Sequence, residues 1–370
     1  MARYKVLHIV PALYSGGVGS FLLNYYRGFD KDLFTFDFVT HFDEKIRVLA
    51  DSLMSTSTVY YFRQQHEIGT LAYVRQYKDV IKNGNYDIVH IHNGHLTGLL
   101  AVICKIYGAK RVTCHAHTTR CMSPKLEGFM WVFRWMCRAF SNRLYACGHD
   151  AGVFCFGTDN FKIIPNGVDF NLYQRSSDED IMRLKQTFNI SQDAFVVGSV
   201  AQFTQQKNHT YLIKVFKSIL EVRPNSVLLL VGDGDLKKVV KAQVEEYGIQ
   251  QNVIFAGFQT EIPKFLSAFD VFLLPSIHEG LPVVAAEAQA LGVKCVFSKH
   301  IDNTCDRKVG LMTFLPITDD SIIDWVTESL RTSKCLDRSD IIKHYIEDCY
   351  DLKEGTMLLQ REYLELLNNI

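Results

Sequence analysis

The chain has 370 residues, more than a single hydrophobic core usually supports, so its length predicts two domains. Hydrophobic residues make up 48% and charged residues 22%, the composition of an ordinary soluble globular protein. Lys plus Arg and Asp plus Glu are equal at 40 each, so the overall charge does not indicate a nucleic-acid partner, and any basic surface must be local.

Short apolar runs typical of buried strands recur along the chain, each followed by a glycine or polar turn and a helical pattern. They lie at 5–10, 36–40, 87–92 and 111–117 in the first half and at 195–200, 226–232, 252–258, 271–276 and 294–299 in the second. Strands alternating with helices indicate βαβ units, and runs that are apolar on both faces indicate buried parallel strands. Between 161 and 180 the pattern stops at a Pro-Asn-Gly turn and an acidic stretch, which is typical of a linker.

We therefore expect an α/β protein with two Rossmann-like, doubly wound domains. Ligands of such sheets bind outside the carboxyl ends of the strands, so the expected active site is a cleft between the two domains. The last apolar pattern, near the end of the chain, predicts a helix that packs back on one of them. The ten cysteines form no CxxC pair and no secretory leader is evident, so we expect reduced cysteines and a cytoplasmic protein.

The glycine loop "YSGGVGS" lies between the first expected strand and a helix. Gly16 and Gly17 can adopt backbone angles closed to other residues, which lets backbone amides approach an anion at a helix N-terminus. The spacing differs from the dinucleotide GxGxxG pattern. A phosphate or acceptor loop and a simple tight turn therefore both stay open.

The stretch "CHAHTTR" ends the strand expected at 111–117. His115 and His117 are two residues apart, so both rings point to the same side of an extended backbone. Such a histidine can donate a hydrogen bond or act as an acid or base, and we expect His115 in the site before His117. A metal site would need a third ligand, and the neighbouring sequence offers no convincing one.

Two loops of the second half carry charges beside glycines or helix starts. Lys207 lies just before a helix, where a fixed ammonium can hold a diphosphate, although a solvated lysine is an alternative. The stretch "VGDGDL" at 231–236 contains an Asp-x-Asp pair, for which ordinary turn chemistry is favoured over a divalent metal site.

The stretch "SIHEGLPVVAAEAQALG" has a glutamate on each side of an apolar turn. Pro282 suits the first turn of a helix, so Glu279 stands before the helix and the amides of Gly280 and Leu281 lie at its positive end. Glu287 lies more than one turn further on, where a carboxylate can accept from two ribose hydroxyls. The neighbouring Val283, Val284, Ala285 and Ala288 would partly bury that carboxylate, which favours a ligand-binding role.

Together these motifs resemble the retaining glycosyltransferases of family 4, of the bacterial exopolysaccharide, capsule and O-antigen type. The resemblance is carried by "GGVGS", "HAHTT", "IPNGVD", "QQKNHTYLIKVF", "LLLVGDGDL", "FLLPSIHEGLPVVAAEAQALG" and the last helix. It implies a GT-B fold. The N-terminal acceptor-binding domain would span 1–168 with the helix 353–370 packed on it, and the C-terminal nucleotide-sugar-binding domain would span 169–352.

The resemblance also implies a role for each matching residue. His115 would contact the donor sugar near the reacting carbon, Lys207 the diphosphate, Glu279 the sugar and the distal phosphate, and Glu287 the ribose. The other donor-binding positions would be Gly16, Gly17, Gln202, Gly280, Leu281, Pro282 and Val283. No metal and no other cofactor is expected, and the glutamates would bind rather than act as an acid/base pair. Gln202 departs from the family, which usually has an arginine there, and the loss of that cation puts full activity in question.

The implied activity is a hexosyl transfer of the EC 2.4 class from a nucleotide-diphosphate sugar, expected to be a UDP-sugar, to a saccharide or undecaprenyl-linked acceptor. The helical stretch 125–143 mixes tryptophans and phenylalanines with cations, which suits either a membrane surface at the inner face of the plasma membrane or a core helix with a solvated basic face. Two other functions stay open: a nucleotide-sugar 2-epimerase of the same fold, and a nucleotide-binding partner subunit without turnover.

Overall fold

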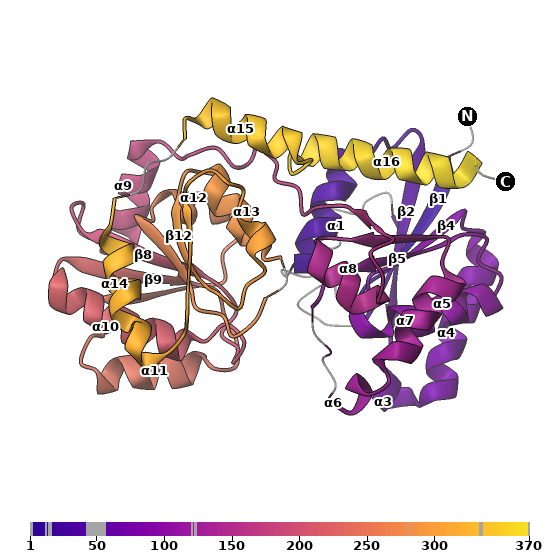
Figure 1. Ribbon diagram of the computed structural model, residues 1–370, viewed down its shortest axis with the longest axis horizontal. Helices are drawn as coiled ribbons and strands as arrows, with labels where there is room; N and C mark the ends of the chain where they lie inside the picture. Colours follow the sequence, from indigo (N-terminus) through magenta and orange to yellow (C-terminus); the bar gives the residue numbers. More distant parts are fainter. Residues whose placement is uncertain are drawn as a thin grey trace. The chain divides into compact units, whose positions relative to one another are not determined.

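The structure is a computed structural model that describes residues 3–11, 13, 17–41, 57–119, 121, 124–279, 281–332 and 336–368. The chain forms two compact units, shown in Figure 1. Unit 1 comprises Met1–Gly167 and Cys349–Ile370, and unit 2 comprises Val168–Asp348. The chain therefore passes between the units twice. The second passage lies at Asp348, four residues before the boundary expected at 352.

Unit 1 is built on a parallel sheet with the strand order β3-β2-β1-β4-β5-β6-β7. Its strands are β1 Tyr4–Ile9, β2 Phe34–His41, β3 Val59–Phe62, β4 Ile88–Ile91, β5 Val112–Ala116, β6 Arg143–Ala146 and β7 Lys162–Ile163. Its helices are α1 Gly17–Gly28, α3 Gln65–Ile68, α4 Thr70–Gly84, α5 Thr97–Ile106, α6 Pro124–Glu127, α7 Met130–Phe140, α8 His149–Phe156 and α16 Leu352–Asn368, with a 3-10 turn at Gly94–Leu96.

The C-terminal helix α16 shares one hydrophobic core with α1 and the first strands. Leu359, Tyr363, Leu366 and Leu367 lie in that core with residues of α1, β1, β2 and β4. The Arg111 guanidinium, which precedes β5, donates to the carbonyls of Leu366 (2.8 Å) and Leu367 (3.0 Å) and so satisfies the end of the helix. The last 22 residues thus complete unit 1 although unit 2 separates them from it in sequence.

Unit 2 repeats the architecture with the strand order β10-β9-β8-β11-β12-β13, again parallel. Its strands are β8 Phe195–Val200, β9 Ser226–Val231, β10 Val253–Gly257, β11 Val271–Leu274, β12 Lys294–Ser298 and β13 Met312–Leu315. Its helices are α9 Asp178–Thr187, α10 His209–Val222, α11 Lys237–Glu246, α12 Ile262–Ser267, α13 Val283–Ala290, α14 Ile322–Leu330 and α15 Arg338–Glu347, with 3-10 turns at Asn303–Cys305 and Asp319–Ser321.

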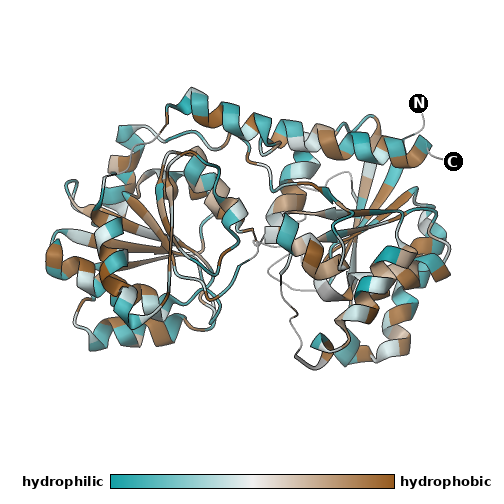
Figure 2. Cartoon of the chain, in the orientation of Figure 1, coloured by the Kyte–Doolittle hydropathy of each residue, from teal (hydrophilic) through white to brown (hydrophobic). Residues whose placement is uncertain are grey.

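The hydropathy pattern explains this layering. The strands are hydrophobic along their length, whereas most helices have a hydrophobic and a hydrophilic side (Figure 2). The middle strands β4, β5, β11 and β12 are buried at every position, as expected for strands covered by helices on both faces. The nine strands predicted from the sequence are confirmed, and β3, β6, β7 and β13 are additional.

Within the described residues, no helix is both long and apolar enough to cross a membrane. The described cysteines are free, and most of them are buried.

Candidate active site

Each sheet has one point at which the strand order reverses, and loops diverge there on opposite sides to leave a crevice for ligands. In unit 2 this point lies between the neighbouring strands β8 and β11. The loop 201–208 leaves the carboxyl end of β8, and the loop 275–282 leaves the carboxyl end of β11. The first loop carries Lys207 and the second carries Glu279, so both of these predicted residues lie at the expected edge of the sheet.

Lys207 and Glu279 form an ion pair between the Nζ and Oε1 atoms. Their side chains are 20% and 10% exposed, so the pair is largely withdrawn from water yet can still be reached. Lys207 lies two residues before α10. Asn208, between Lys207 and the helix, adopts a left-handed backbone with φ 52°. Since attraction between charges strengthens as water is excluded, this pair fixes the ammonium group more firmly than a surface pair would.

One backbone and one side-chain hydrogen bond hold the two loops together. The Ile277 amide donates to the Gln206 carbonyl (2.8 Å), and Gln206 Nε2 donates to the His278 carbonyl (3.0 Å). Lys207 and Glu279 directly follow these residues in their loops. These contacts between the loops bring Lys207 and Glu279 together, so the pairing does not depend on the two long side chains alone.

A third loop, after β12, supports Glu279 from the other side. The Glu279 amide donates to the His300 carbonyl (3.3 Å), and the Asp302 amide donates to the Glu279 carbonyl (3.4 Å). These bonds make a short parallel bridge between Glu279 and Ile301. This support could not be predicted, because residues 300–302 contain no sequence pattern that pairs them with Glu279.

Helix α13 begins directly after the loop 275–282, which carries Glu279. Pro282 is the residue that precedes the helix, with φ −67° and ψ 119°, and not a member of its first turn as predicted. The helix starts at Val283, and the side chains of Leu281 and Val283 are both buried. Gly280 lies outside the described residues. The positive end of α13 thus lies four residues after Glu279. A helix N-terminus of this kind can bind an anion.

Glu287 lies on α13 and is buried, with 8% of its surface exposed. Burial raises the pKa of its carboxyl to about 7, and a hydrogen bond with the Tyr173 side chain opposes that rise. The predicted burial of this carboxylate is therefore present. Tyr173, near the start of unit 2, is a partner that sequence reasoning missed.

Two further predicted positions lie in the loops after β8 and β9. Gln202 is exposed, and its carbonyl accepts from the Thr204 amide (2.8 Å). Gly232 has φ 139°, and a side chain there would bring a Cβ within 2.1 Å of the Ala201 carbonyl. Asp233 accepts from the Gly234 amide (2.8 Å) and pairs with Lys237 (3.2 Å). The "VGDGDL" stretch is thus a tight turn packed against the loop 201–208, as its glycines suggest.

In unit 1 the order reverses between β1 and β4. Gly17 begins α1 after β1, with open space around it, and Gly16 lies outside the described residues. His115 is fully buried on β5, with its ring edge-on to Phe21 at 5.0 Å between centroids, whereas His117 is partly exposed. The ring of His92, just after β4, lies beside both of these rings, at 5.2 Å between centroids in each case. His92 was not among the predicted site residues, although "DIVHIH" has the same His-x-His spacing.

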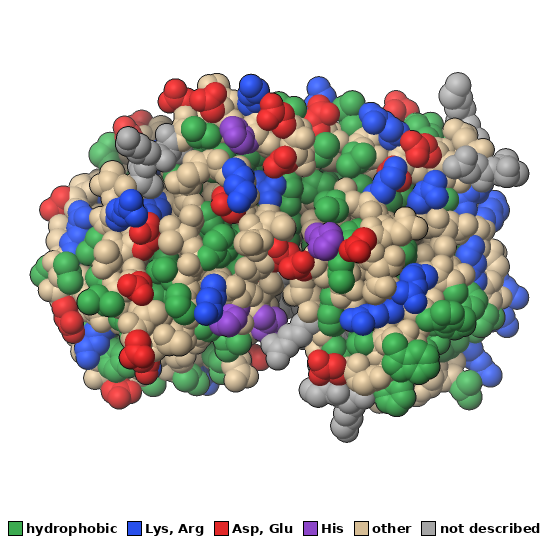
Figure 3. Space-filling view, in the orientation of Figure 1, with side chains coloured by type: hydrophobic (Ala, Val, Ile, Leu, Met, Phe, Trp, Pro, Cys, Tyr) green, Lys and Arg blue, Asp and Glu red, His purple; other side chains and the backbone are tan. Residues whose placement is uncertain are grey.

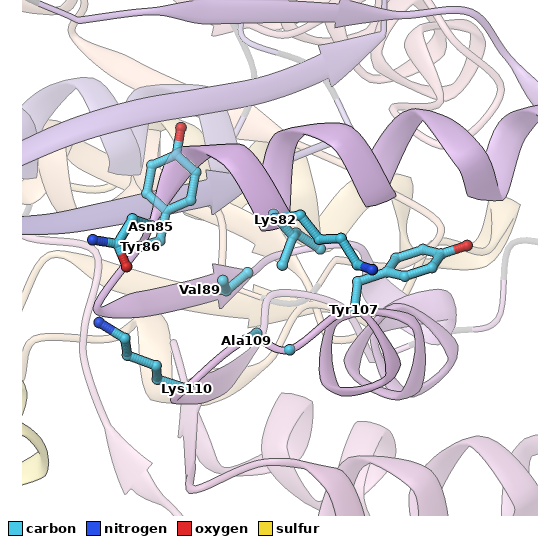
Figure 4. A pocket seen from close by; sticks show the side chains of 9 residues that line it. Lys82, Asn85, Tyr86, Val89, Tyr107, Ala109 and Lys110 are labelled. Carbon is cyan, nitrogen blue, oxygen red and sulfur yellow. The ribbon is translucent and has the colours of Figure 1, made fainter.

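A cavity of about 180 Å³ lies at the opposite edge of the same sheet (Figure 4). Tyr86 and Lys110, which line it, precede β4 and β5. The cavity therefore opens at the amino ends of the strands, away from the edge where such sheets bind ligands.

The comparisons with known proteins agree with this architecture. The family described as Glycosyltransferase Family 4 matches residues 15–172, and the family described as Glycosyl transferases group 1 matches residues 180–306. The chain is 32% identical to "Putative glycosyltransferase EpsF" of Bacillus subtilis over 86% of this chain and 85% of the relative. It is 28% identical to "UDP-Gal:alpha-D-GlcNAc-diphosphoundecaprenol alpha-1,3-galactosyltransferase" of Escherichia coli, over 73% and 76% of the two chains.

Solved structures show the same fold. Anabaena HepE in complex with UDP and glucose superposes with a TM-score of 0.76 at 19% identity and covers all of both chains. WaaG, "a glycosyltransferase involved in lipopolysaccharide biosynthesis", superposes with a TM-score of 0.67 at 15% identity over 99% of this chain and all of the other. With a relative of 32% identity that spans most of both sequences, the chain belongs to glycosyltransferase family 4, has the GT-B fold of two parallel-sheet α/β domains, and is a glycosyltransferase.

Proposed function

We propose that this glycosyltransferase moves a hexose, with retention of its anomeric configuration, from a UDP-sugar to a saccharide or undecaprenyl-linked acceptor in bacterial surface polysaccharide synthesis. The observation that carries the proposal is the Lys207–Glu279 ion pair, at the point where the strand order of unit 2 reverses. Glu279 lies four residues before the positive end of α13. This arrangement combines a cation and a helix N-terminus, the groups that a nucleoside diphosphate needs.

The chemistry follows from where charge develops. When the bond to the sugar breaks, negative charge grows on the leaving diphosphate, and Lys207 with the first-turn amides of α13 would stabilise it. Lys207 is held by Glu279 before the donor binds, so no reorganisation of the loop is required at the moment of reaction. Donor binding would let the ammonium turn from the carboxylate toward the phosphates.

Neither glutamate is arranged as a glycosidase acid or nucleophile. Glu279 is bound to Lys207, and Glu287 is buried beside Tyr173. Glu287 suits the ribose of the donor instead, because a carboxylate can accept from two neighbouring hydroxyls. Transfer would thus proceed by attack on the face that the diphosphate leaves, with the phosphate accepting the proton of the acceptor hydroxyl. This step needs no metal at the diphosphate.

The donor and acceptor classes are supported by the names of similar proteins. HepE was solved with UDP and glucose, and the E. coli relative is named for transfer from UDP-Gal to a diphosphoundecaprenol-linked sugar. A lipid-linked acceptor would be met at the inner face of the plasma membrane, so the protein would work from the cytoplasm at that surface.

Helix α7 is the surface proposed to contact that membrane. Trp131 is 69% exposed and Trp135 is 52% exposed. Figure 3 shows hydrophobic side chains gathered where α7 lies in Figure 1, with Lys or Arg side chains beside them. Arg134 and Arg138 donate to carbonyls at the end of α8. Their charges support α8 as well as any lipid contact, so the tryptophans are the sharper test of membrane binding.

The deciding experiment incubates the protein with UDP- and GDP-sugars, with and without undecaprenyl-diphosphate-linked saccharides. Acceptor-dependent release of UDP, with a product whose new linkage keeps the donor's anomeric configuration by NMR, supports the proposal. Interconversion of two donor sugars without acceptor would instead identify a 2-epimerase. Nucleotide binding without either reaction would identify a partner subunit, and an inverted product would contradict retention.

A further inference from the structure

Five histidines lie side by side at the carboxyl edge of the sheet in unit 1. His8 is on β1, His90 and His92 are on or just after β4, and His115 and His117 are on or just after β5. These three strands are neighbours in the sheet. His8 is aligned with His90 in the register of β1 and β4, and the two His-x-His pairs keep their rings on one face because side chains alternate along a strand.

Hydrogen bonds between the rings pair only some of the five histidines. His8 Nδ1 lies 3.1 Å from His92 Nε2, and His92 Nδ1 lies 2.9 Å from His117 Nε2. His115 is fully buried, and its ring nitrogens make no hydrogen bond with the other four rings. Burying polar groups is costly, so a row of apolar side chains would fill this space at lower cost.

The geometry of three of these rings fits a metal ion. His92, His115 and His117 each offer a ring nitrogen, and these nitrogens all lie within 4.8 Å of one another. A tetrahedral Zn²⁺ with bonds of about 2.0–2.1 Å needs its ligand nitrogens about 3.3 Å apart. The 2.9 Å between His92 Nδ1 and His117 Nε2 would have to open by a few tenths of an ångström. The separations from His115, which are at most 4.8 Å, would have to settle near the same value.

We propose that His92, His115 and His117 form a binding site for one divalent transition-metal ion of the Zn²⁺ class, with a water in the fourth position. Imidazole ligands favour Zn²⁺, Co²⁺ or Ni²⁺ over Mg²⁺ or Ca²⁺, and three protein ligands with one open position are typical of accessible zinc sites. His117 is the partly exposed member, through which the ion would enter.

The neighbouring ring of His8 would orient one of these ligands. With His92 Nδ1 on the metal, its Nε2 would carry the proton and donate to His8 Nδ1, an outer contact of the kind that orients metal-bound histidines.

The proposed transfer step needs no metal at the diphosphate in unit 2, so the metal ion proposed here has no part in that step, although the family resemblance assigns one of its ligands, His115, to the donor sugar. The site also supplies the third ligand that the sequence around His115 and His117 did not reveal. A metal ion at this site would make the expectation of a metal-free protein wrong for the chain as a whole.

The test titrates the purified, chelator-treated full-length protein with ZnCl₂ by calorimetry, and with CoCl₂ by visible absorption. MgCl₂ serves as the comparison ion. The variants are His115→Gln and His117→Gln, and the control is His66→Gln, which removes an exposed histidine of α3 in the same unit. Circular dichroism establishes that each variant is folded. If the variant of the buried His115 does not fold, the variant of the partly exposed His117 still provides the test.

We expect one Zn²⁺ per wild-type chain, the strong visible absorption of four-coordinate Co²⁺, and a higher melting temperature with Zn²⁺ because the ion binds the folded state. Zn²⁺ affinity should fall about 100-fold in His117→Gln and remain unchanged in His66→Gln. Equal Zn²⁺ affinity in the wild type and the folded His117→Gln variant would overturn the proposal. So would the absence of Zn²⁺ binding and of a thermal shift in the wild type. Neither readout depends on turnover, so failure here leaves the proposed transferase function untouched.

Discussion

Lys207 and Glu279 come from loops after two different strands, and hydrogen bonds between the two loops hold them in one ion pair. Glu279 therefore restrains the cation that we assign to the diphosphate. We expect Lys207→Met to lower kcat/KM for the donor by about 10²–10³-fold, the usual cost of losing one group that stabilises a developing anion. The matched control is Lys214→Met, which removes a lysine paired with Asp319 at 2.8 Å on an exposed surface of the same unit. Equal losses in both variants would contradict the assignment.

Glu279→Gln should separate nucleotide binding from transfer. The substitution keeps the shape of the side chain but releases Lys207 from its carboxylate, so UDP no longer competes with a fixed anion. We expect tighter UDP binding by calorimetry together with slower transfer, since Glu279 is also assigned to the sugar. If UDP binds more weakly to the variant than to the wild type, Glu279 contributes attraction to the nucleotide and the competition described here is wrong.

Gln202 is exposed at the carboxyl end of β8, where the family usually has an arginine. We expect Gln202→Arg to strengthen donor binding by about tenfold, because a hydrogen bond to a charged group contributes about 1.5 kcal/mol or more. The control is Gln205→Arg, which adds the same charge at another exposed position of the same loop. An equal gain in both variants would show a general effect of charge, and no gain in either would show that the site does not lack a cation.

The sequence predicted the interior of both sheets and most of the candidate site, but not the edges. The buried strands β8 and β11 are apolar on both faces and could be recognised without other information. The edge strand β7 has two exposed residues, so it has no hydrophobic signal, and β13 is only half-buried. Lys207 and Glu279 could each be chosen from their place before a helix.

What could not be predicted is which residues meet across the fold. The bridge from Glu279 to Ile301 and the bond from Tyr173 to Glu287 join segments with no shared periodicity. The position of His92 beside His115 depends on the strand order, which local patterns do not give. Pro282 was misplaced by one position, because its fixed φ suits both the residue before a helix and the first residue within it.

Glu287 should make unit 2 less stable as the pH rises. Its folded pKa of about 7 lies above the ordinary 4.5, so the folded state holds a proton that the unfolded state has lost between these values. Stability from this group is complete below about pH 4.5 and falls as the pH rises through 7, by at most about 3 kcal/mol. We expect Glu287→Gln to match the wild type in urea denaturation at pH 4.5 and to exceed it at pH 8. Its donor affinity should be lower at pH 8, where the wild type presents a carboxylate to the ribose. If Glu287→Gln and the wild type were equally stable at pH 8 as well as at pH 4.5, the raised pKa of Glu287 would be contradicted.

The exposed tryptophans of α7 give the membrane proposal a direct test. We expect the Trp131→Ser, Trp135→Ser double variant to lose most binding to vesicles that contain phosphatidylglycerol, measured by co-sedimentation, while transfer to a water-soluble acceptor stays unchanged. Phe258→Ser is the control, because Phe258 is 54% exposed in unit 2 and lies on no proposed membrane surface. Unchanged vesicle binding in the double variant, or no binding by the wild type, would exclude α7 as the contact.

Gly355 tests how α16 closes unit 1. Replacing a helical glycine by alanine normally stabilises a helix by up to about 1 kcal/mol. Here the added Cβ would lie 2.5 Å from the Tyr25 hydroxyl, which cannot easily withdraw because it donates to the Pro165 carbonyl at 2.6 Å. We therefore expect Gly355→Ala to destabilise the protein by about 1–3 kcal/mol, as overpacking of a core does, and to lower the melting temperature. Gly128→Ala is the control, since a Cβ there meets no atom within 4 Å. A rise in melting temperature for Gly355→Ala would mean that α16 does not approach α1 as closely as the structure has it.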